Sequence, residues 1–397
     1  MEWRVPLSDL DFGQAEKEAV NQVMDRGWLA MGEITQQFEA EFAAMTGVRH
    51  AIAVTNGTAS LHLALLALGI GPGDEVIVPS LTFVATANAI LYAGAKPVFA
   101  DITSLENLNI SVEEIEKKIS SRTRGIMVMH YGGYPADMPA ILEIAQRHNL
   151  RVIEDAAHAP GAEIDGRKMG AWGQIASFSF FPNKNMTTAE GGMLTTDDDA
   201  LAQKMRTLRS HGMTTLTWDR HRGHAWSYDV TDLGYNYRID EIRSAIGREQ
   251  LKKLLQNNNR RAELTALYRE LFARHVPEIS IPFAGFPWRS SHHILPILLP
   301  AGVNRRRFAE VMKEQRVQTS LHYPPIHLFQ YYRENGLSPE QPLPMTEAAA
   351  AREVTIPLYA TLQPAQVEIV VHSVREAFLQ AREYAQPEAA PSAQSGL

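Results

Sequence analysis

The sequence predicts an α/β fold in which a mostly parallel, doubly wound sheet is covered by helices on both faces. Between residues 50 and 155, short apolar runs alternate with stretches of helical periodicity. Turn-forming residues such as Asn56-Gly57 and the GPGD segment separate these runs. Parallel strands that are joined by crossover helices account for this alternation. In such sheets, ligands bind beyond the carboxyl ends of the strands, so residues at those ends are the first candidates for a site.

The individual elements follow from the same periodicities. Helical structure is expected over about 12–46 and in SLHLALLALG, TFVATANAILYAG, Ile115–Ser120, MPAILEIAQRHN, ALAQKMRTLRSHG and about 239–275. Strands are expected at His50–Val54 and in the segments EVIVPS, KPVFADI, GIMVMH, LRVIEDAA, QIASFSFF and GGMLTT. A long loop should occupy about 213–238. HHILPILL, VQTSLHYPP and a helix after Pro364 indicate a further α/β unit.

These patterns divide the chain into two units and a tail. Residues 1–250 are expected to form a large domain that includes the N-terminal helical segment. Residues 251–385 should form a smaller C-terminal α/β domain. The tail at 386–397 is rich in Pro, Ala and Ser and is expected to be disordered.

Composition narrows the class of protein. The 397 residues carry a net charge of −7 with both signs interspersed, which argues against nucleic acid as a partner. The absence of cysteine excludes disulfides and thiolate metal sites. The start of the chain lacks the apolar stretch of a secretion signal, and no apolar run approaches the roughly 18 residues of a membrane span. A cytoplasmic protein without a membrane segment is therefore expected.

Lys184 is the first candidate for chemistry. It lies in SFSFFPNKNMTTAEGGM, between two expected strands and among aromatic, small and amide side chains. Such surroundings would partly desolvate the amine and lower its pKa, which favours the neutral nucleophile that forms an imine with an aldehyde cofactor. An ordinary loop lysine is the alternative. Lys168 is a rival, but it lies in the polar turn GRKMG.

Asp155 ends an apolar strand at the edge of the sheet where a ligand would bind. A pyridine cofactor needs a carboxylate beside its ring nitrogen, because the protonated ring is the electron sink. The alternative is that this aspartate only caps the next turn.

A phosphate site is indicated where Asn56-Gly57-Thr58 opens a helix, since helix N-termini offer free N–H groups and a partial positive charge. Ser179, five residues before Lys184, supplies a hydroxyl for the same anion. Taken alone, the segment is more typical of a simple N-cap at Thr58 than of a phosphate site.

The order of these features along the chain resembles the fold-type I pyridoxal-phosphate enzymes, and more narrowly the sugar aminotransferases of the DegT/DnrJ/EryC1/StrS family. The resemblance covers about residues 5–380. It is carried by NGTASLHLALLALGIGPGDEVIVPSLTFVATANAILYAGAKPVFADI, VIEDAAHAPGA, SFSFFPNKNMTTAEGGML, DLGYNYRIDEIRSAIG, LHYPPIHLFQYYRE and IPLYATL.

The resemblance implies roles for individual residues. Lys184 would hold pyridoxal 5′-phosphate and later act as acid and base, and Asp155 would pair with the ring nitrogen. His158 would contact the 3-oxygen of the cofactor, and Phe83 would stack on its ring. Gly57, Thr58 and Ser179 would hold the phosphate, and Asn236 would reach the phosphate of the neighbouring subunit, which implies a homodimer with shared active sites. Arg238, His322 and His327 would lie near the substrate.

The family also implies the reaction, which is transfer of an amino group from L-glutamate to a keto-sugar. The usual acceptor is a 4-keto sugar, sometimes a 3-keto sugar, on UDP, dTDP or GDP, and the product serves cell-surface glycans or antibiotics. TSLHYPPIH, YYRE and LTFVATAN look most like the branch that uses UDP-linked sugars. A keto-cyclitol aminotransferase shares these motifs, and a cofactor-binding regulatory protein is a more remote alternative. A minority branch with His in place of the lysine performs dehydration, so Lys184 favours transamination.

Other patterns have simpler explanations. Gln174 stands where many relatives have Asp, and we interpret it as structural. None of the fourteen histidines, including His292-His293, shows recognised metal-ligand spacing, so no metal site is expected. Asp197-Asp198-Asp199 precede a helix, where acids cap N–H groups. The basic cluster Arg220, His221, Arg222 and His224 could meet a nucleotide diphosphate or be solvated.

Overall fold

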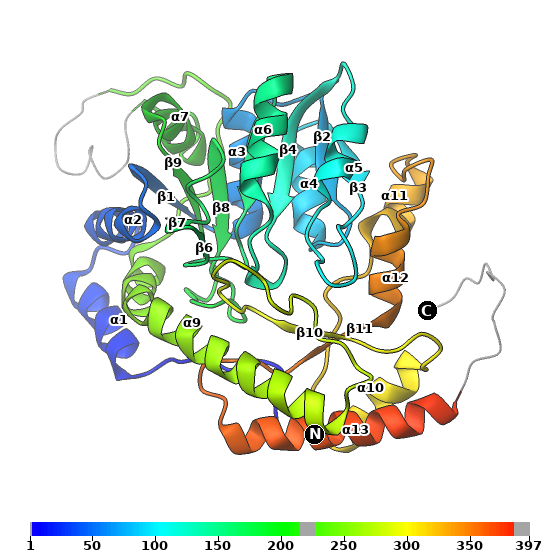
Figure 1. Ribbon diagram of the computed structural model, residues 1–397. Coiled ribbons are helices and arrows are strands. Elements are labelled where there is room, and N and C mark those ends of the chain that lie inside the picture. Colours follow the sequence, from blue (N-terminus) through cyan, green and yellow to red (C-terminus); the bar gives the residue numbers. More distant parts are fainter. Residues whose placement is uncertain (1, 215–226, 385–397) are drawn as a thin grey trace.

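A seven-stranded sheet forms the centre of the protein in the computed structural model, which describes residues 2–214 and 227–384 (Figure 1). Six strands run parallel and β9 runs antiparallel to both of its neighbours. In spatial order the strands are β1 (His50–Val54), β9 (Gly192–Thr196), β8 (Ile175–Ser179), β5 (Arg151–Asp155), β4 (Thr123–Met129), β2 (Glu75–Pro79) and β3 (Lys96–Ala100). The predicted α/β class with a mostly parallel sheet is confirmed.

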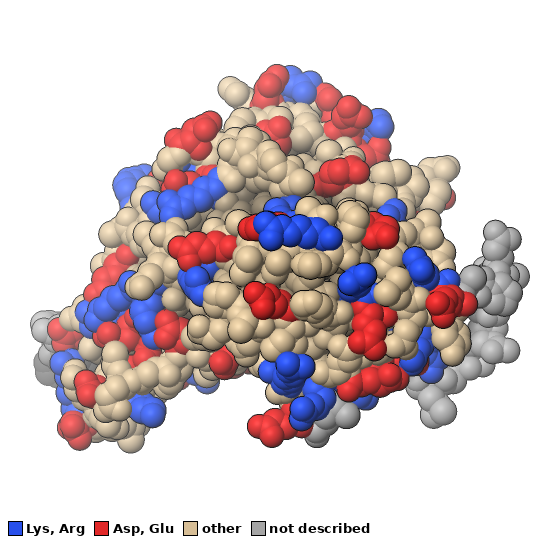
Figure 2. Space-filling view, turned by 60° about the horizontal axis from the view of Figure 1, so that its bottom comes forward, with Lys and Arg blue, Asp and Glu red and all other residues tan. Residues whose placement is uncertain are grey.

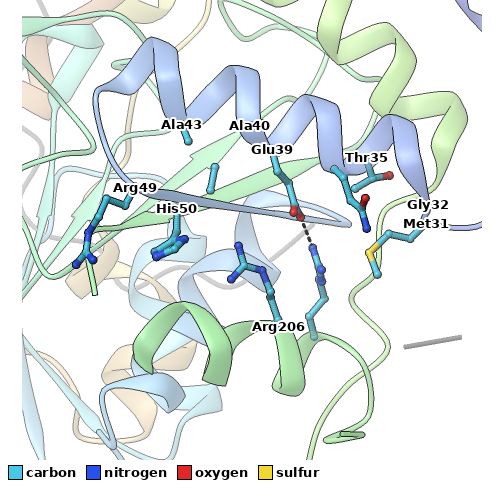
Figure 3. A pocket seen from close by; sticks show the side chains of 12 residues that line it. Met31, Gly32, Thr35, Glu39, Ala40, Ala43, Arg49, His50 and Arg206 are labelled. Atoms are coloured by element: carbon cyan, nitrogen blue, oxygen red, sulfur yellow. Dashed lines mark hydrogen bonds and ion pairs between the residues drawn. The ribbon is translucent and has the colours of Figure 1, made fainter. Parts of the chain in front are cut away.

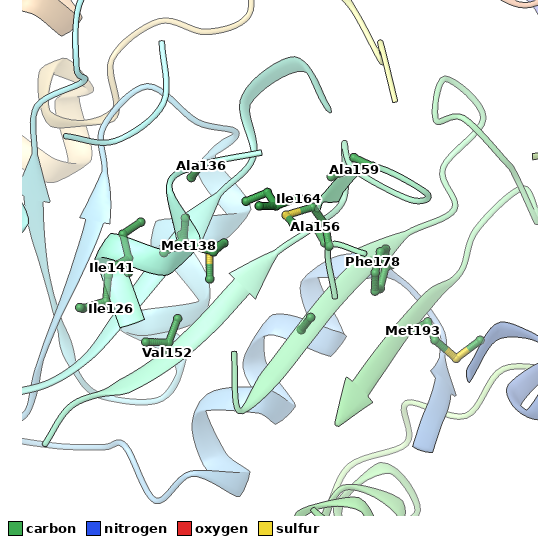
Figure 4. Packing of buried hydrophobic residues seen from close by; sticks show 14 of the residues in the cluster. Ile126, Ala136, Met138, Ile141, Val152, Ala156, Ala159, Ile164, Phe178 and Met193 are labelled. Atoms are coloured by element: carbon green, nitrogen blue, oxygen red, sulfur yellow. The ribbon is translucent and has the colours of Figure 1, made fainter. Parts of the chain in front are cut away.

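Alternating side chains on these strands divide between two apolar layers, as a strand period of two requires. Ile126, Val152, Phe178 and Met193 point to one layer, which Figure 4 shows together with Met138. The helices on that side are α2 (Glu33–Thr46), α5 (Val112–Lys117), α6 (Met138–His148) and the first half of α9 (Glu241–His275). On the other side lie α3 (Gly57–Ala67), α4 (Val84–Tyr92) and α7 (Asp199–Arg209).

A third apolar cluster belongs to the C-terminal part of the chain. There the two-stranded antiparallel sheet of β10 (Leu295–Leu298) and β11 (Glu353–Ile356) packs with α10 (Arg305–Glu314), α13 (Pro364–Glu383) and the second half of α9. Val5 joins this cluster and pairs with Val317, so the first residues of the chain pack on its C-terminal part. The remaining elements are α1 (Gln14–Arg26), α11 (Gln330–Glu334), α12 (Pro344–Arg352), the hairpin of β6 (Glu163–Ile164) and β7 (Arg167–Lys168), and the 3₁₀ turns η1 (Tyr131–Gly133) and η2 (Ile326–Leu328).

Polar side chains determine where many of the helices begin. The first N–H groups of a helix lack partners within it, and a cap supplies an acceptor. Side chains with this role are Asn56 for α3, Ser111 for α5, Asp137 for α6, Asp198 for α7, Asp240 for α9 and Asn304 for α10. Asp198 thus acts as the cap that the acidic run predicted.

Two sequence expectations need correction, and two others lie outside the described residues. The helical stretch expected over 12–46 is two helices, because Gly27 adopts a left-handed φ of 74° and ends α1. The short helix expected at Ile115–Ser120 begins earlier, at Val112, because Ser111 caps it. The basic cluster Arg220, His221, Arg222 and His224 and the tail at 386–397 lie outside the described residues.

The expected division after residue 250 falls inside α9, which is continuous from Glu241 to His275. This helix packs against α1 and α2 and also against α13. The division of the chain into two domains at that point stays a prediction.

The surface carries both signs of charge. Lys and Arg alternate with Asp and Glu over the face in Figure 2, without a large area of one sign. Within the described ranges, none of the helices combines the length and apolar character needed to cross a membrane.

Candidate active site

A cavity of about 610 Å³ lies at the carboxyl ends of the sheet strands, where the fold predicts a ligand. Segments from the whole chain line it: Asn56, Gly57, Thr58, Leu61, Thr82, Phe83, Ala85, Met129, Asp155, Ala157, His158, Ser177, Ser179, Phe181, Asn183, Lys184, Glu190, Ser320, Leu321, His322 and Tyr323. Of the expected site residues, Lys184, Asp155, Gly57, Thr58, Phe83, His158, Ser179 and His322 therefore share one cavity.

Lys184 lies in the loop between β8 and β9, and its neighbours fix that loop. Its own N–H donates to the carbonyl of Phe181 at 2.9 Å. The next residue, Asn185, donates from Nδ2 to Asn258 Oδ1 at 2.7 Å and to the carbonyl of Ser291 at 2.8 Å. Burial lowers the pKa of the Lys184 amine to about 8, and the charge of Asp155 opposes this shift. The lysine is thus held rigidly with an amine that loses its proton readily.

Asp155 is the last residue of β5 and is buried with 5% of its surface exposed. Thr86 Oγ1 on α4 donates to its Oδ2 at 2.7 Å, and the N–H of Ala157 donates to its Oδ1 at 3.2 Å. Burial raises the pKa of this carboxyl, while the two hydrogen bonds and Lys184 act in the opposite direction. A cationic group placed against Asp155 would favour the charged form of its carboxyl, which is the form that pairs with a protonated pyridine nitrogen.

The start of α3 and the end of β8 form a cradle for an anion. Asn56 caps the helix by accepting from the N–H of Ala59 at 2.8 Å, which leaves Gly57 and Thr58 at the open end. A Cβ on Gly57 would come within 2.8 Å of Ser179 Cβ, so glycine lets the helix start approach the serine. The free N–H groups of the first turn and the Ser179 hydroxyl suit a phosphate.

His158 lines the cavity and is buried with 2% of its surface exposed. Its Nε2 is 3.0 Å from Tyr323 Oη, and its ring centroid is 4.2 Å from that of His293. Burial holds the pKa of His158 well below its usual range, and Lys184 adds to this effect. Nδ1 of His158 has no hydrogen-bond partner in the described structure. A neutral imidazole with unused hydrogen-bonding capacity fits a polar ring substituent of a ligand.

Phe83 caps α4 and presents its ring to the cavity, with 55% of its surface exposed. The ring centroid of Tyr323 lies 5.9 Å away. An exposed phenyl ring that lines a cavity offers a face on which an aromatic ligand ring can stack.

His322 is the one of the three expected substrate residues that lines the cavity. Its Nδ1 is 2.8 Å from Thr355 Oγ1, and burial lowers its pKa to about 4. His327 lies elsewhere, with Nδ1 2.7 Å from Ser80 Oγ and Nε2 3.3 Å from Glu347 Oε1. Arg238 does not line the cavity either, so substrate contacts of His327 and Arg238 stay predictions.

Asn236 is exposed and also lies outside the cavity lining. It forms an isolated bridge with Ser210 at the end of α7, next to the stacked rings of Tyr235 and Tyr237, whose centroids are 5.0 Å apart. Its role toward a second subunit stays a prediction.

Gln174 has the structural role that its position suggested. Its Oε1 accepts from the N–H of Val152 at 2.6 Å, and its own N–H donates to the carbonyl of the same residue at 3.0 Å. These bonds extend the pairing of β5 and β8 at the end away from the cavity.

Several residues of the site were missed in the sequence. Thr86, Tyr323 and His293 contact expected site residues from other segments. Asn185 joins the loop of Lys184 to α9 through Asn258. Thr86 and Tyr323 lie inside motifs that carried the family resemblance, and that was the available signal. Nothing in the local sequence indicates that Tyr323 faces a histidine 165 positions away.

The sheet and the cavity together define a class of protein. A lysine with a depressed pKa, a buried carboxylate, an anion cradle and an exposed aromatic ring in one cavity fit pyridoxal 5′-phosphate, and the protein is a pyridoxal-phosphate-dependent enzyme of fold type I. The chain belongs to the DegT/DnrJ/EryC1/StrS aminotransferase family, whose sequence model matches residues 11–375. The family resemblance, the fold type, the enzyme class and the cofactor expected from the sequence are thereby confirmed.

Individual relatives cover nearly the whole chain. The spore coat polysaccharide biosynthesis protein SpsC of Bacillus subtilis is 40% identical over 377 residues, which are 94% of this chain and 96% of SpsC. The Helicobacter pylori aminotransferase PseC, involved in the biosynthesis of pseudoaminic acid, is 30% identical with a TM-score of 0.87 and coverage of 96% and 100%. DesV of S. venezuelae is 35% identical, with a TM-score of 0.85 and coverage of 94% and 98%. These relatives identify the chain as a sugar aminotransferase.

Proposed function

We propose that this enzyme transfers an amino group from L-glutamate to a nucleotide-linked keto-sugar, in the synthesis of an amino sugar for a cell-surface glycan or an antibiotic. The observation that carries the proposal is the cavity of about 610 Å³ shared by Lys184 and Asp155, within a chain of the sugar aminotransferase family. Two similar proteins, SpsC and PseC, are described by their roles in the biosynthesis of a spore coat polysaccharide and of pseudoaminic acid.

The bound cofactor supplies an aldehyde that takes up the amino group and a ring that delocalises the electron pair left on carbon. Lys184 supplies the amine that anchors it. Because the pKa of this amine is about 8, it can both bind a proton and release it near neutral pH. Once displaced by the donor amine, Lys184 would be the base that removes the proton from the donor α-carbon and the acid that delivers it to the former aldehyde carbon.

Asp155 keeps the cofactor ring nitrogen protonated, and the hydrogen bond from Thr86 at 2.7 Å fixes the orientation of its carboxylate. His158 contacts the 3-oxygen of the cofactor and is itself positioned by Tyr323, 3.0 Å from its Nε2. Phe83 covers the ring, and Gly57, Thr58 and Ser179 hold the phosphate. Each of these groups restrains the cofactor so that the reacting carbon stays beside Lys184.

The remaining cavity wall suits a sugar. Asn183, Glu190, Ser320 and His322 line it with amide, carboxylate, hydroxyl and imidazole groups, which form hydrogen bonds with sugar hydroxyls. Arg238 and His327 would approach the substrate only at the cavity rim or in an assembled dimer. Asn236 of one subunit would complete the phosphate site of the other, so that a homodimer is the active form.

The acceptor can be identified by a direct screen. The enzyme with L-glutamate would be offered UDP-, dTDP- and GDP-linked keto-sugars, and the aminated product would be characterised by mass spectrometry and NMR. We expect one nucleotide-linked 4-keto sugar to be converted, with oxoglutarate released in equal amount. A keto-cyclitol added in competition with the nucleotide sugars tests the other class of acceptor. If the cyclitol were aminated and no nucleotide sugar were converted, the proposal would be contradicted.

A further inference from the structure

A second cavity of about 350 Å³ shares no residue with the one that contains Lys184. It lies between α2 and α7 beside the edge strand β1, as Figure 3 shows. Its lining consists of Met31, Gly32, Thr35, Gln36, Glu39, Ala40, Ala43, Arg49, His50, Ala51, Arg206 and Arg209. Its volume is at the lower end of the roughly 300–1,000 Å³ that small-molecule sites enclose.

The charges of this cavity are predominantly positive. Its lining contains three arginines and a single carboxylate, Glu39. Arg49 lies at the rim, where its Nη1 is 2.9 Å from Asp199 and its side chain is 59% exposed. Arg206 is half-buried on α7 and lies opposite Glu39 on α2 in Figure 3. Among the described residues, 2–214 and 227–384, it has no ion-pair or hydrogen-bond partner. Its charge is therefore available to a ligand.

Arg209 is an unusual cation because only 2% of its surface is exposed. Its Nη1 donates to Glu39 Oε1 at 2.5 Å and to the carbonyl of Ala53 at 2.7 Å. Its Nε is buried and has no partner in the described part of the chain. A guanidinium carries five N–H donors, and a buried donor without a partner is unfavourable. The cavity is thus lined by a guanidinium that two hydrogen bonds hold in place and whose Nε–H is unpaired.

The backbone of β1 adds to this wall. Because β1 is at the edge of the sheet, one side of its backbone has no neighbouring strand. Ala53 turns its N–H toward Glu39 Oε1 at 2.9 Å and its carbonyl toward Arg209 on that open side. Ala51 lies two residues earlier, so the strand period turns its N–H to the same side, and Ala51 lines the cavity.

We propose that this cavity binds a small oxyanion, a phosphate or a carboxylate, between Arg206 and Arg209. The planar guanidinium matches two oxygens of such an anion, and Arg209 is held in place before the ligand arrives. Glu39 fixes the orientation of Arg209 and limits the ligand to a small anion of low charge. The site is separate from the proposed transamination and does not depend on it.

The test is isothermal titration calorimetry on the pyridoxal-phosphate-loaded enzyme, whose cofactor already occupies the Gly57–Ser179 cradle. Inorganic phosphate and succinate would be titrated separately at constant ionic strength, which distinguishes the two kinds of oxyanion. We expect saturable binding of at least one of them. Arg206→Gln should weaken it about tenfold or more, because a charge-assisted hydrogen bond contributes about 1.5–3 kcal/mol.

Two further variants make the result specific. Lys204→Gln removes the same charge from the same helix but lies outside the cavity lining, so it should bind the anion as the unmodified enzyme does. Ala40→Leu fills the cavity from an exposed position on α2 without changing any charge, and it should weaken binding. Absence of saturable binding, or equal binding by Arg206→Gln and Lys204→Gln, would overturn the proposal.

Discussion

At the scale of single residues, the environment of Lys184 makes its amine different from the other lysines of the chain. Solvated lysines stay protonated far above neutral pH, whereas burial lowers the pKa of Lys184 to about 8. The amide-rich sequence around it predicted partial desolvation. Burial of the amine is a tertiary effect, and the hydrogen bonds of Asn185 to Asn258 and Ser291 tie the loop to the rest of the protein.

Replacement of Lys184 by arginine tests its role in anchoring the cofactor. Lys184→Arg keeps the positive charge but cannot form the covalent bond, so we expect the fold to persist and covalent retention of the cofactor to be lost. Borohydride reduction, digestion and mass spectrometry should place the pyridoxyl label on Lys184 in the unmodified enzyme and nowhere in the variant. Lys168→Arg is the matched control and should keep the label. A label on another lysine, or full activity of Lys184→Arg, would refute the assignment.

The depressed pKa of Lys184 has a measurable consequence for pH dependence. The amine attacks the aldehyde only when neutral, that is, above its pKa. The rate at which the cofactor-free enzyme captures pyridoxal phosphate should therefore rise with pH and level off above about 8. Stopped-flow absorbance measures this rate. A rate that continues to rise to about pH 10, as for an exposed lysine, would contradict the prediction.

Asp155 should affect turnover more than binding. Asp155→Ala removes the partner of the ring nitrogen but leaves the phosphate cradle intact, so some cofactor should remain. The half-reaction with L-glutamate should slow by about 100-fold or more, comparable to the loss of a positioned acid or base. Thr86→Ala loses only the hydrogen bond to Oδ2 and should have a smaller effect. Near-normal rates in Asp155→Ala would show that another group protonates the ring.

At the scale of elements, one carboxylate joins two helices distant in sequence. Glu241, at the start of α9, accepts from the N–H groups of Gly32, Ile34 and Thr35 at 2.8–2.9 Å and from the Thr35 hydroxyl at 2.7 Å. The N-cap position of α2 is Gly32, which has no side chain to serve as an acceptor. Glu241 therefore caps α2 from another helix, which sequence periodicity alone does not indicate.

Removal of this remote cap should destabilise the protein. Glu241→Ala leaves several buried N–H groups without acceptors, so the free energy of unfolding should fall by about 3 kcal/mol. Urea denaturation followed by circular dichroism measures it. Glu18→Ala, on the exposed side of α1, is the control and should change stability by less than about 0.5 kcal/mol. Equal stability of the two variants would show that water replaces the carboxylate.

At the scale of the whole molecule, the question is whether two chains share each active site. Asn236 is exposed and does not line the cavity of its own chain, which is compatible with a contact to the phosphate site of a second subunit. Closed twofold dimers place the same surface on both partners, so each subunit would give one asparagine and receive one.

Subunit mixing tests this arrangement. Lys184→Ala and Asn236→Ala should each have low activity alone. After unfolding and refolding together in equal amounts, about one quarter of the unmodified activity should return, because half of the dimers are mixed and each has one intact site. Mixing without refolding is the control. No recovery after mixing, or a fully active monomer in sedimentation, would refute the shared site.

The local sequence determined much of this protein. The alternation of strands and helices, the Asp198 cap, and the candidates Lys184 and Asp155 all follow from short-range patterns, because periodicity, turn chemistry and strand ends are local properties. The cap of α3 is Asn56 and not Thr58, the residue that the sequence suggested. The break between α1 and α2 was missed although Gly27 marks it.

Only the tertiary structure decided which residues meet. Thr86 orients Asp155, and Tyr323 faces His158. His327 contacts Ser80 and Glu347 and does not line the cavity. The order of the strands and the packing of the C-terminal part of the chain bring these segments together. The cavity around Arg209 is likewise formed by α2, β1 and α7, which come from different parts of the chain. Local propensity fixes what a segment can form, whereas contacts between distant segments depend on how all of them pack at once.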